Sequence, residues 1–321
     1  MDDSGENKKT PAKIPVVVIS GPTASGKSSL AIDMALEMNA EIISADSRQI
    51  FRTLRIGTAR LTEDEMRGVP HHLSGIIELG QRYTVFDYMR DARRFIKEIA
   101  ARGRLVIVCG GTGLYLRALI DGIFEIPEDD FSYRQELIDL AAQHGPTYIY
   151  QRLLEVDPEE AVKIHPNNLV KVIRALEIYH LTGKPKSYLA GTQTAPSPDL
   201  KFLQLTLLPD RTELYKRIDA RVDEMIRQGL VDEVRGIYDS PDREALRQCK
   251  IVGYSELIDS FEGRFTLETA WDLIKKNTRR FAKRQYTWFR RVNEAGILKS
   301  FGAEAAPRCR ELILGFLAAG N

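Results

Sequence analysis

An eight-residue glycine-rich segment, GPTASGKS at residues 21–28, constrains the fold of this chain more than any other feature. It follows the apolar run PVVVIS at residues 15–20, which is typical of a strand buried on both faces of a parallel sheet. The segment matches G-x-x-x-x-G-K-[ST], a pattern that places a phosphate-binding loop between a strand and a helix. The sequence therefore predicts a strand, a phosphate loop and a helix from Lys27 to about Met38.

The loop residues are the candidate ligands of a diphosphate or triphosphate. Lys27 would neutralise the phosphates, and the Ser28 hydroxyl is placed to bind Mg²⁺. The other members of the loop are Gly21, Pro22, Thr23, Ala24, Ser25 and Gly26. This pattern predicts a phosphate site without saying which compound is bound or what is done to it.

Further strands and helices alternate along the chain. Apolar runs at residues 41–44, 105–109 and 200–208 are typical of buried strands, and Thr84 with Asp87 forms a capping box that begins a helix. The alternation predicts an α/β fold: a P-loop NTPase-like core in which helices flank a mostly parallel sheet. Ligands of such folds bind at the carboxyl ends of the strands.

The pattern changes after about residue 125. Residues 126–198 show helical patterns without a strand-like run, which predicts an all-helical insertion domain. We therefore expect the core to consist of residues 14–125 and 199–321, with basic helices near the C-terminus. Residues 1–13 lack the basic start and apolar run of a signal peptide, and we expect them to form a short disordered tail.

Composition limits the partners and the compartment. The chain carries 46 Lys and Arg against 45 Asp and Glu, so attraction to a polyanion must come from local clustering of charge. The three cysteines lack the spacing of a disulfide framework or of zinc ligands. His71 and His72 have no third metal ligand nearby, so we expect them to have a structural or hydrogen-bonding role. No apolar stretch approaches the roughly 20 residues that span a bilayer. We expect a soluble cytoplasmic protein that does not contact membranes, and nothing requires more than a monomer.

Two polar residues follow strands that should end beside the phosphate loop. Asp46 could hold a metal, orient a substrate, accept a proton, or simply cap the next turn. Thr112 lies among Gly110, Gly111 and Gly113, which either let the chain approach a ligand closely or form a plain tight turn. An ATP-using enzyme of this class normally has an apolar strand that ends in a metal-binding Asp. Here the candidate strand at residues 105–109 is followed by the segment GGTG at residues 110–113.

Residues 271–291 concentrate positive charge and aromatic rings. The segment has one acidic residue, Asp272, and the basic residues Lys275, Lys276, Arg279, Arg280, Lys283, Arg284, Arg290 and Arg291. Basic pairs that recur every four residues form a stripe along one side of a helix. With the interleaved aromatic residues, the stripe favours contact with RNA. The alternative is a solvated helix face.

In this order, these motifs resemble one family, the tRNA dimethylallyltransferases, also called tRNA isopentenyltransferases. The resemblance covers about residues 14–293. Besides the phosphate loop, its marks are ISADSRQIF at 43–51, IGTA at 56–59, HHL at 71–73, GGTGLYLRAL at 110–119, IHPNN at 164–168, RALE at 174–177, RIDARVDEMIRQGLVDEV at 217–234, VGY at 252–254 and AKRQYTWFR at 282–290.

The resemblance implies transfer of a dimethylallyl group from dimethylallyl diphosphate to N6 of adenine 37 of tRNA, next to the anticodon, with release of diphosphate. It implies that Lys27, Ser28 and Mg²⁺ stabilise the departing diphosphate. Asp46 would accept the proton from N6, and Thr112 would hydrogen-bond the substrates. The further diphosphate contacts that it implies are Arg221 and Arg217.

The resemblance also implies contacts with the tRNA anticodon stem-loop, whose target adenine must leave its stack to react. These contacts would lie beside the base, in the insertion domain and on the basic helix. They are Asp46, Ser47, Arg48, Gln49, Thr112, Arg134, Lys171, Arg174, Lys250, Gly253, Tyr254, Arg279, Lys283 and Arg284.

Three other functions share part of the pattern. An ATP-dependent kinase of a nucleoside or small metabolite would have the same loop and sheet, but it would not need the segment at 110–113 or a basic aromatic helix. An isopentenyltransferase acting on free AMP would use the same chemistry without the RNA-binding features. A non-enzymatic RNA-binding protein would leave Asp46 and the complete phosphate loop without a purpose.

Overall fold

The computed structural model describes residues 13–123, 131–190, 197–292 and 296–319. The chain divides into two compact units: a core unit of Met1–Ile120 and Ser197–Asn321, and an insertion unit of Asp121–Pro196. The sequence patterns place this insertion at residues 126–198. The predicted tail at residues 1–13 lies outside the described residues, except for Lys13.

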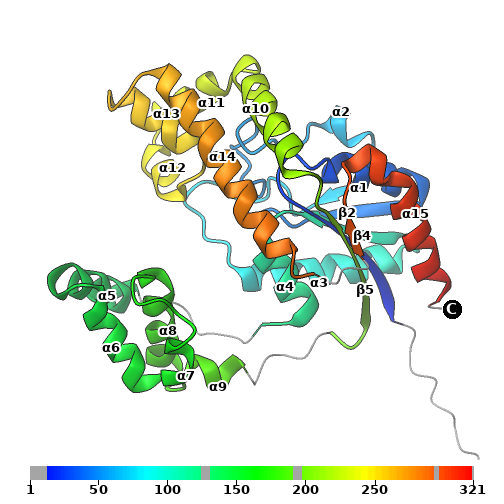
Figure 1. Cartoon of the computed structure of the whole chain (residues 1–321). Coiled ribbons are helices and arrows are strands. Elements are labelled where there is room, and N and C mark those ends of the chain that lie inside the picture. The colour runs from blue at the N-terminus through cyan, green and yellow to red at the C-terminus, as the bar shows by residue number, and fades with distance from the viewer. Residues whose placement is uncertain (1–12, 124–130, 191–196, 293–295, 320–321) are drawn as a thin grey trace, which may run out of the picture. The chain divides into compact units, whose positions relative to one another are not determined.

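The core unit is built on a six-stranded sheet with the order β3-β2-β4-β1-β5-β6, in which all neighbouring strands are parallel (Figure 1). At the ends of the central strands, Ser20 pairs with Gly110 and Ser44 with Cys109. The loops after these strands therefore leave the same edge of the sheet. The central strands are β1 (Ile14–Ser20), β2 (Ala40–Ser44), β4 (Leu105–Gly110) and β5 (Leu200–Leu207).

Alternate side chains of the strands pack on two helical layers. Val17 and its neighbours on one face pack against α1 (Lys27–Glu37) and α15 (Gly302–Ala318). Val16 and its neighbours on the other face pack against two further helices, α3 (Val85–Ala101) and α4 (Gly113–Asp121). The strands are buried on both faces, as continuous apolar runs predict. This arrangement confirms the predicted α/β core.

The boundaries of the elements follow local signals. The Thr84 side chain accepts a hydrogen bond from the Asp87 N–H, and the Asp87 carboxylate accepts one from the Thr84 N–H, which confirms the predicted capping box at the start of α3. The two edge strands, β3 (His71–His72) and β6 (Ile297–Leu298), were not predicted. Two residues are too few to show a periodic pattern.

A group of helices lies beside the sheet edge where the central strands end (Figure 1). Their apolar residues share a cluster that includes Ile50, Leu54, Val222 and Tyr254. This cluster fixes the helices against the chain that follows β2. The helices are α10 (Arg211–Arg227), α11 (Leu230–Tyr238), α12 (Arg243–Cys249), α13 (Tyr254–Phe261) and α14 (Leu267–Phe289), and a short helix, α2 (Glu63–Met66), precedes β3.

The described part of the insertion unit is helical. Its own core contains Leu137, Ile149, Leu153 and Val172. Both α6 and α7 begin at a proline, which is favourable in the first helical turn because the missing N–H would have no partner there. The helices are α5 (Phe131–His144), α6 (Pro146–Val156), α7 (Pro158–Ala161), α8 (Leu169–Thr182) and α9 (Lys186–Ala190).

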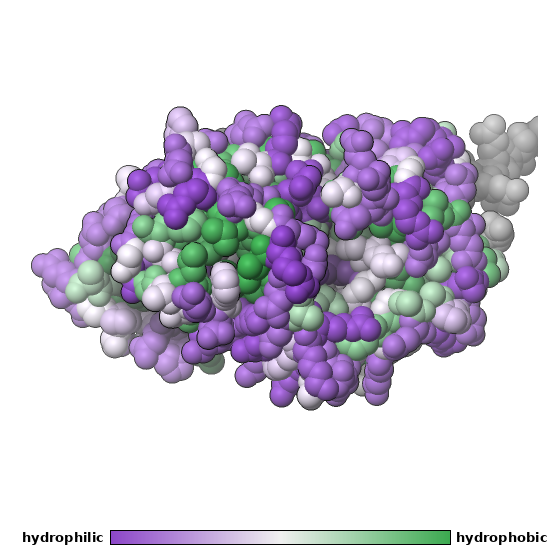
Figure 2. Space-filling view, turned by 90° about the horizontal axis from the view of Figure 1, so that it is seen from above, coloured by the Kyte–Doolittle hydropathy of each residue, from purple (hydrophilic) through white to green (hydrophobic). Residues whose placement is uncertain are grey.

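The surface seen from above is mostly hydrophilic, with hydrophobic residues gathered toward the side of α11 and α13 (Figure 2). Partly buried apolar residues of α10 and α11, such as Ile226 and Val231, pack on the cluster that contains Ile50 and Tyr254. Among the helices that the structure describes, none has the length and apolar character needed to cross a membrane.

The two adjacent histidines have structural hydrogen bonds. His71 Nδ1 lies 2.8 Å from the Val69 carbonyl oxygen, and His72 Nε2 lies 2.6 Å from the carboxylate of buried Glu41. Arg102 donates two further bonds to Glu41. Burial alone would raise the pKa of Glu41, but the hydrogen bonds from Arg102 and His72 outweigh it and hold the pKa below its usual 4.5.

Replacing this carboxylate should destabilise the fold in a pH-dependent way. We expect Glu41→Gln to lower the free energy of unfolding at pH 7 by about 1–3 kcal/mol, because a buried acceptor of charged donors is lost. A carboxyl with a depressed pKa contributes above its unfolded pKa, so the difference should shrink as pH falls below 4.5. Urea unfolding at pH 7 and pH 4 measures this effect; an equal difference at both pH values would contradict it.

Candidate active site

Three loops meet where β1, β4 and β2 end. The phosphate loop follows β1, residues 45–49 follow β2, and residues 111–113 follow β4. The Thr112 N–H donates to the Ala45 carbonyl at 3.1 Å, and the Ser47 N–H donates to the Thr112 hydroxyl at 2.9 Å. Within the phosphate loop, Gly26 has a φ of +86°, a conformation that favours glycine, and α1 begins at the next residue.

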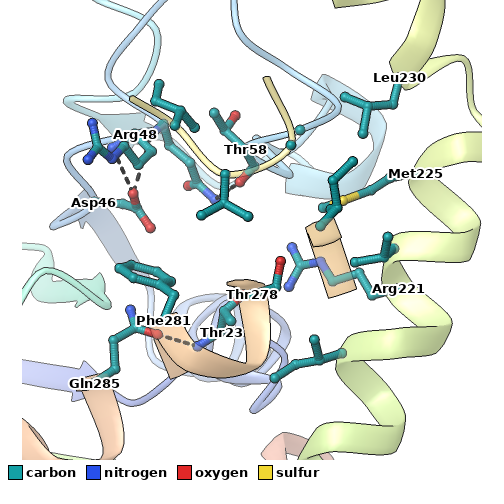
Figure 3. Close-up of a pocket in the computed structure, with 18 of the residues that line it drawn as sticks. Thr23, Asp46, Arg48, Thr58, Arg221, Met225, Leu230, Thr278, Phe281 and Gln285 are labelled. Atoms are coloured by element: carbon teal, nitrogen blue, oxygen red, sulfur yellow. Dashed lines mark hydrogen bonds between the residues drawn. The ribbon is translucent and has the colours of Figure 1, made fainter. Parts of the chain in front are cut away.

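A cavity of about 190 Å³ opens beside these loops. Thr23, Lys27 and Ser28 of the phosphate loop line it, and Asp46 and Arg221 face it from opposite sides (Figure 3). The cavity therefore combines charged groups with an apolar wall, most of which comes from α10 and α14. That wall consists of Ile218, Val222, Met225, Leu230, Ile251, Val252, Ile274 and Phe281.

The charged groups of the cavity influence one another. Desolvation lowers the pKa of the Lys27 ammonium, an effect that Cys109 and Asp46 oppose and Arg221 reinforces. Burial also lowers the pKa of Arg221, and Asp46 again opposes the shift. Two desolvated cations thus share this space with one carboxylate. An anionic ligand would stabilise both cations in their charged forms.

Asp46 caps a turn, as one of its interpretations predicts, and it also faces the cavity. A role as a metal ligand, a substrate contact or a proton acceptor stays a prediction. One carboxylate oxygen, Oδ1, accepts the N–H of Arg48 at 2.9 Å and that of Gln49 at 3.4 Å. In the described part of the chain, no hydrogen bond engages the other oxygen. The turn therefore fixes the orientation of the carboxylate and leaves its other oxygen able to accept a hydrogen bond in the cavity that Asp46 lines.

Thr112 lines a smaller opening beside the main cavity. Its hydroxyl accepts the Ser47 N–H and donates to the Ser47 hydroxyl, 3.2 Å away. Trp288, on the last turn of α14, lines the same opening, and Arg284 lines both spaces. Thr112 therefore holds the turn that carries Asp46 and lies at the edge of the site.

The chain matches the family model described as IPP transferase over residues 49–292. A tRNA dimethylallyltransferase of Geobacillus thermodenitrificans is 49% identical over 280 residues, which are 86% of this chain and 87% of that relative. One of Symbiobacterium thermophilum is 44% identical over 305 residues, 94% of each chain. The chain belongs to the IPP transferase family.

Solved structures of similar proteins agree with this assignment. The full-length tRNA isopentenylpyrophosphate transferase of Bacillus halodurans shares 38% identity and a TM-score of 0.69, covering 96% of this chain and 98% of its own. A eukaryotic dimethylallyltransferase acting on tRNA shares 29% identity and a TM-score of 0.78, covering 95% of this chain and 80% of its own.

In this IPP transferase family member, several predicted RNA contacts lie together around the cavity. Arg48, Gln49, Lys250 and Gly253 all line it. The Arg48 guanidinium donates to the Cys249 carbonyl at 3.2 Å, so it ties the turn after β2 to the segment that begins at Lys250. Gln49 Nε2 donates to two carbonyls of the loop at residues 58–59, at 3.2 and 3.0 Å.

Tyr254 belongs to the core and not to an RNA-binding surface. It is 0% exposed, and its hydroxyl donates to the Glu233 carboxylate. The same carboxylate accepts the N–H groups of Ile56 and Gly57, at 2.8 and 3.3 Å. Glu233, which the sequence analysis did not single out, therefore holds the IGTA loop in place. Its position in the family motif at 217–234 was the available signal.

The basic stripe divides into two sides. Lys275 and Arg279 form ion pairs with Asp223 and Asp219 of α10. The RNA contact at Arg279 stays a prediction. Lys283 and Arg284 are exposed, together with Lys276, Arg280, Arg290 and Arg291. Within α14, the exposed residues Lys276, Arg280, Lys283 and Arg284 recur every three or four residues, and Arg290 and Arg291 follow the end of the helix.

Two other groups of predicted residues are not among the described residues that line the cavity. Arg217 is exposed, and its guanidinium lies over the Phe301 ring, 3.6 Å from the centroid. In the insertion unit, Arg134 forms hydrogen bonds of 2.6 and 2.7 Å with the Glu177 carboxylate, and Arg174 donates to the same group at 3.4 Å. Glu177 is 1% exposed, so these bonds stabilise the insertion unit. The third predicted residue of this unit, Lys171, is exposed.

Proposed function

We propose that this chain transfers a dimethylallyl group from dimethylallyl diphosphate to N6 of adenine 37 of tRNA. The observation that carries the proposal is the combination, in one cavity, of a phosphate loop, an apolar wall and a carboxylate that faces it. The loop suits a diphosphate, the wall suits a hydrocarbon chain, and Asp46 suits a proton acceptor. A kinase acting on a polar metabolite would have no use for the apolar wall.

The phosphate loop offers groups that a diphosphate would satisfy. Lys27 is desolvated and donates to the Pro22 carbonyl at 3.3 Å. The Ser25 hydroxyl is buried and has no hydrogen-bond partner in the described part of the chain. Arg221 adds a second positive charge from the opposite wall (Figure 3). These groups would bind the diphosphate in the substrate and stabilise the charge that grows on it as it departs.

Mg²⁺ fits this donor set. Among the described residues, no cluster of three or more His, Cys, Asp or Glu side chains could hold a metal by itself. Mg²⁺, however, usually combines one or two protein oxygens with phosphate oxygens and water. We propose that the Ser28 hydroxyl and the diphosphate would hold it. The ion would supply positive charge to the leaving group.

The reaction forms one bond and breaks another. The N6 nitrogen of adenine bonds to C1 of the dimethylallyl group, the bond between C1 and the diphosphate oxygen breaks, and the electron pair leaves with diphosphate. The proton lost from N6 goes to the Asp46 carboxylate, which the Arg48 and Gln49 N–H groups orient. Thr112 would hold the adjacent turn while the adenine enters.

The RNA would meet the cations around the cavity. Arg48, Lys250 and Arg284 line it, and Lys283 lies beside them on α14. These groups would offset the few kcal/mol needed to evert the adenine. We propose that the insertion unit also contacts the tRNA. We further propose that the chain acts on tRNA as a monomer in the cytoplasm.

Removing two of these cations should change how RNA binding depends on salt. For Lys283→Ala/Arg284→Ala, we expect weaker binding of an anticodon stem-loop, and a slope of log Kd against log salt reduced by roughly 0.7–0.9 per lost phosphate contact. Filter binding between low and moderate salt measures the slope. Arg308→Ala on α15 is the control. A slope equal to that of the wild type would assign these residues to a solvated helix face.

One experiment tests the function and its rivals together. The wild-type chain is incubated with Mg²⁺, dimethylallyl diphosphate and either total tRNA or AMP, and the products are measured by mass spectrometry. We expect addition of one C₅H₈ unit to tRNA, mapped by nuclease digestion to the base next to the anticodon. Modification of AMP alone would favour the free-nucleotide enzyme. Phosphate transfer in a parallel incubation with labelled ATP and candidate acceptors, without prenylation of tRNA, would favour the kinase.

A further inference from the structure

Gln285, on the buried side of α14, joins the phosphate loop to the loop after β4. Its side-chain Oε1 accepts the Thr23 N–H at 2.9 Å, and its Nε2 donates to the Gly111 carbonyl at 2.9 Å. Figure 3 shows the bond to Thr23. Gln285 is 7% exposed and lines both the main cavity and the opening beside Thr112. Nothing in the sequence pattern distinguished it from its basic neighbours.

These two bonds complete a hydrogen-bonded path across three loops. Thr112 already ties the loop after β4 to the turn after β2, through its bonds with Ala45 and Ser47. Gln285 adds the connection from Gly111 to the phosphate loop. The path therefore runs from the groups that would bind diphosphate to the turn that orients Asp46.

Both partners of Gln285 require a side-chain amide. Thr23 offers a donor and Gly111 an acceptor, and an uncharged amide supplies the matching acceptor and donor at once. A carboxylate would present a second acceptor to the Gly111 carbonyl. An aliphatic chain would remove the partner of the buried Gly111 carbonyl and of the partly buried Thr23 N–H. A Cβ at Gly111 would lie 2.5 Å from Nε2, so the glycine makes room for the amide.

We propose that Gln285 is a positioning residue for prenyl transfer: its amide holds the phosphate loop, and the departing diphosphate with it, in place relative to Asp46. The inference rests on the proposed function. Reacting atoms must be held about 3–3.5 Å apart and aligned, so a small displacement of the loop lowers the rate. The helix that carries Lys283 and Arg284 toward the RNA also fixes the phosphate loop through Gln285.

The test compares two variants with the wild-type chain. Gln285→Leu removes both bonds, and Gln285→Glu keeps only the acceptor for Thr23. Gln248→Leu, at an exposed glutamine of α12, is the matched control. Calorimetry gives the Kd for inorganic diphosphate with Mg²⁺, steady-state kinetics give kcat and KM for dimethylallyl diphosphate, and filter binding gives the Kd for an anticodon stem-loop.

For Gln285→Leu, we expect the diphosphate Kd to rise about tenfold and kcat/KM to fall about 10–100-fold, because the Thr23 N–H and the buried Gly111 carbonyl lose their partner and the loop shifts. The stem-loop Kd should change less than twofold. Gln285→Glu should weaken diphosphate binding at least as much as Gln285→Leu, because its carboxylate would face the Gly111 carbonyl and the diphosphate. A general structural defect would instead weaken diphosphate and RNA binding together, and that result would overturn the proposal.

The remaining outcomes also test the role of Gln285. If Gln285→Leu does not fold, the same measurements on Gln285→Glu replace it. Diphosphate Kd and kcat/KM within twofold of the wild type in a folded variant would overturn the proposal. If the wild type binds diphosphate but prenylates no tRNA, the proposed function fails, whereas the diphosphate Kd values still show whether Gln285 holds the loop.

Discussion

Asp46→Asn should leave RNA binding nearly intact and lower kcat by roughly 10²–10⁴-fold, the usual contribution of a positioned general base. Asparagine keeps an oxygen that can accept the N–H groups of Arg48 and Gln49, so the turn should keep its shape. It cannot accept the proton that leaves N6. Single-turnover kinetics with saturating dimethylallyl diphosphate and an anticodon stem-loop isolate this step.

The control for this variant is Asp272→Asn, at an exposed aspartate of α14. It removes the same charge from the core unit without touching the cavity, so we expect wild-type turnover. The stem-loop Kd should be measured for both variants. Wild-type turnover in Asp46→Asn would remove Asp46 as the base. A rate loss that higher RNA concentrations restore would assign it to substrate binding.

The fold and the polar part of the site could be predicted because their signals are local. The phosphate loop lies between a continuous apolar strand and a helix, and both neighbours are adjacent in sequence. Asp46 and Thr112 each follow a buried strand, and parallel strands bring their carboxyl ends to one edge. The sequence did not settle whether Asp46 caps a turn or serves the site. The structure shows that one oxygen caps the turn while the carboxylate faces the cavity.

The remaining parts of the site depend on contacts between distant segments. Arg279 belongs to a basic stripe, but its partner Asp219 lies on another helix, and no spacing within α14 reveals which side is paired. Tyr254 is buried because Glu233 and Gly57 meet it from elsewhere in the chain. The role of Gln285 could not be predicted for the same reason, because its two partners lie in loops far from it in sequence. A helical pattern shows where side chains point but not what they contact.

Lys27→Met should lower kcat by about 10²–10³-fold, the usual cost of removing one preorganised group that stabilises charge developing in a transition state. Methionine keeps a flexible stem of similar length and loses only the ammonium. Lys27 is desolvated and lies near Arg221. Bulk water therefore cannot stabilise the diphosphate in place of the missing ammonium. The Kd for diphosphate should rise as well, and calorimetry with Mg²⁺ measures that change.

The control for Lys27→Met is Lys276→Met, at an exposed lysine of α14. It removes the same charge from the protein without removing a charge from the cavity. It should leave diphosphate binding unchanged and weaken RNA binding slightly at low salt. Equal effects of the two variants on kcat would show that the phosphate loop does not stabilise the leaving group. A larger effect of Lys27→Met on kcat than on the diphosphate Kd would place its main contribution in the transition state, where charge on the departing diphosphate is greatest.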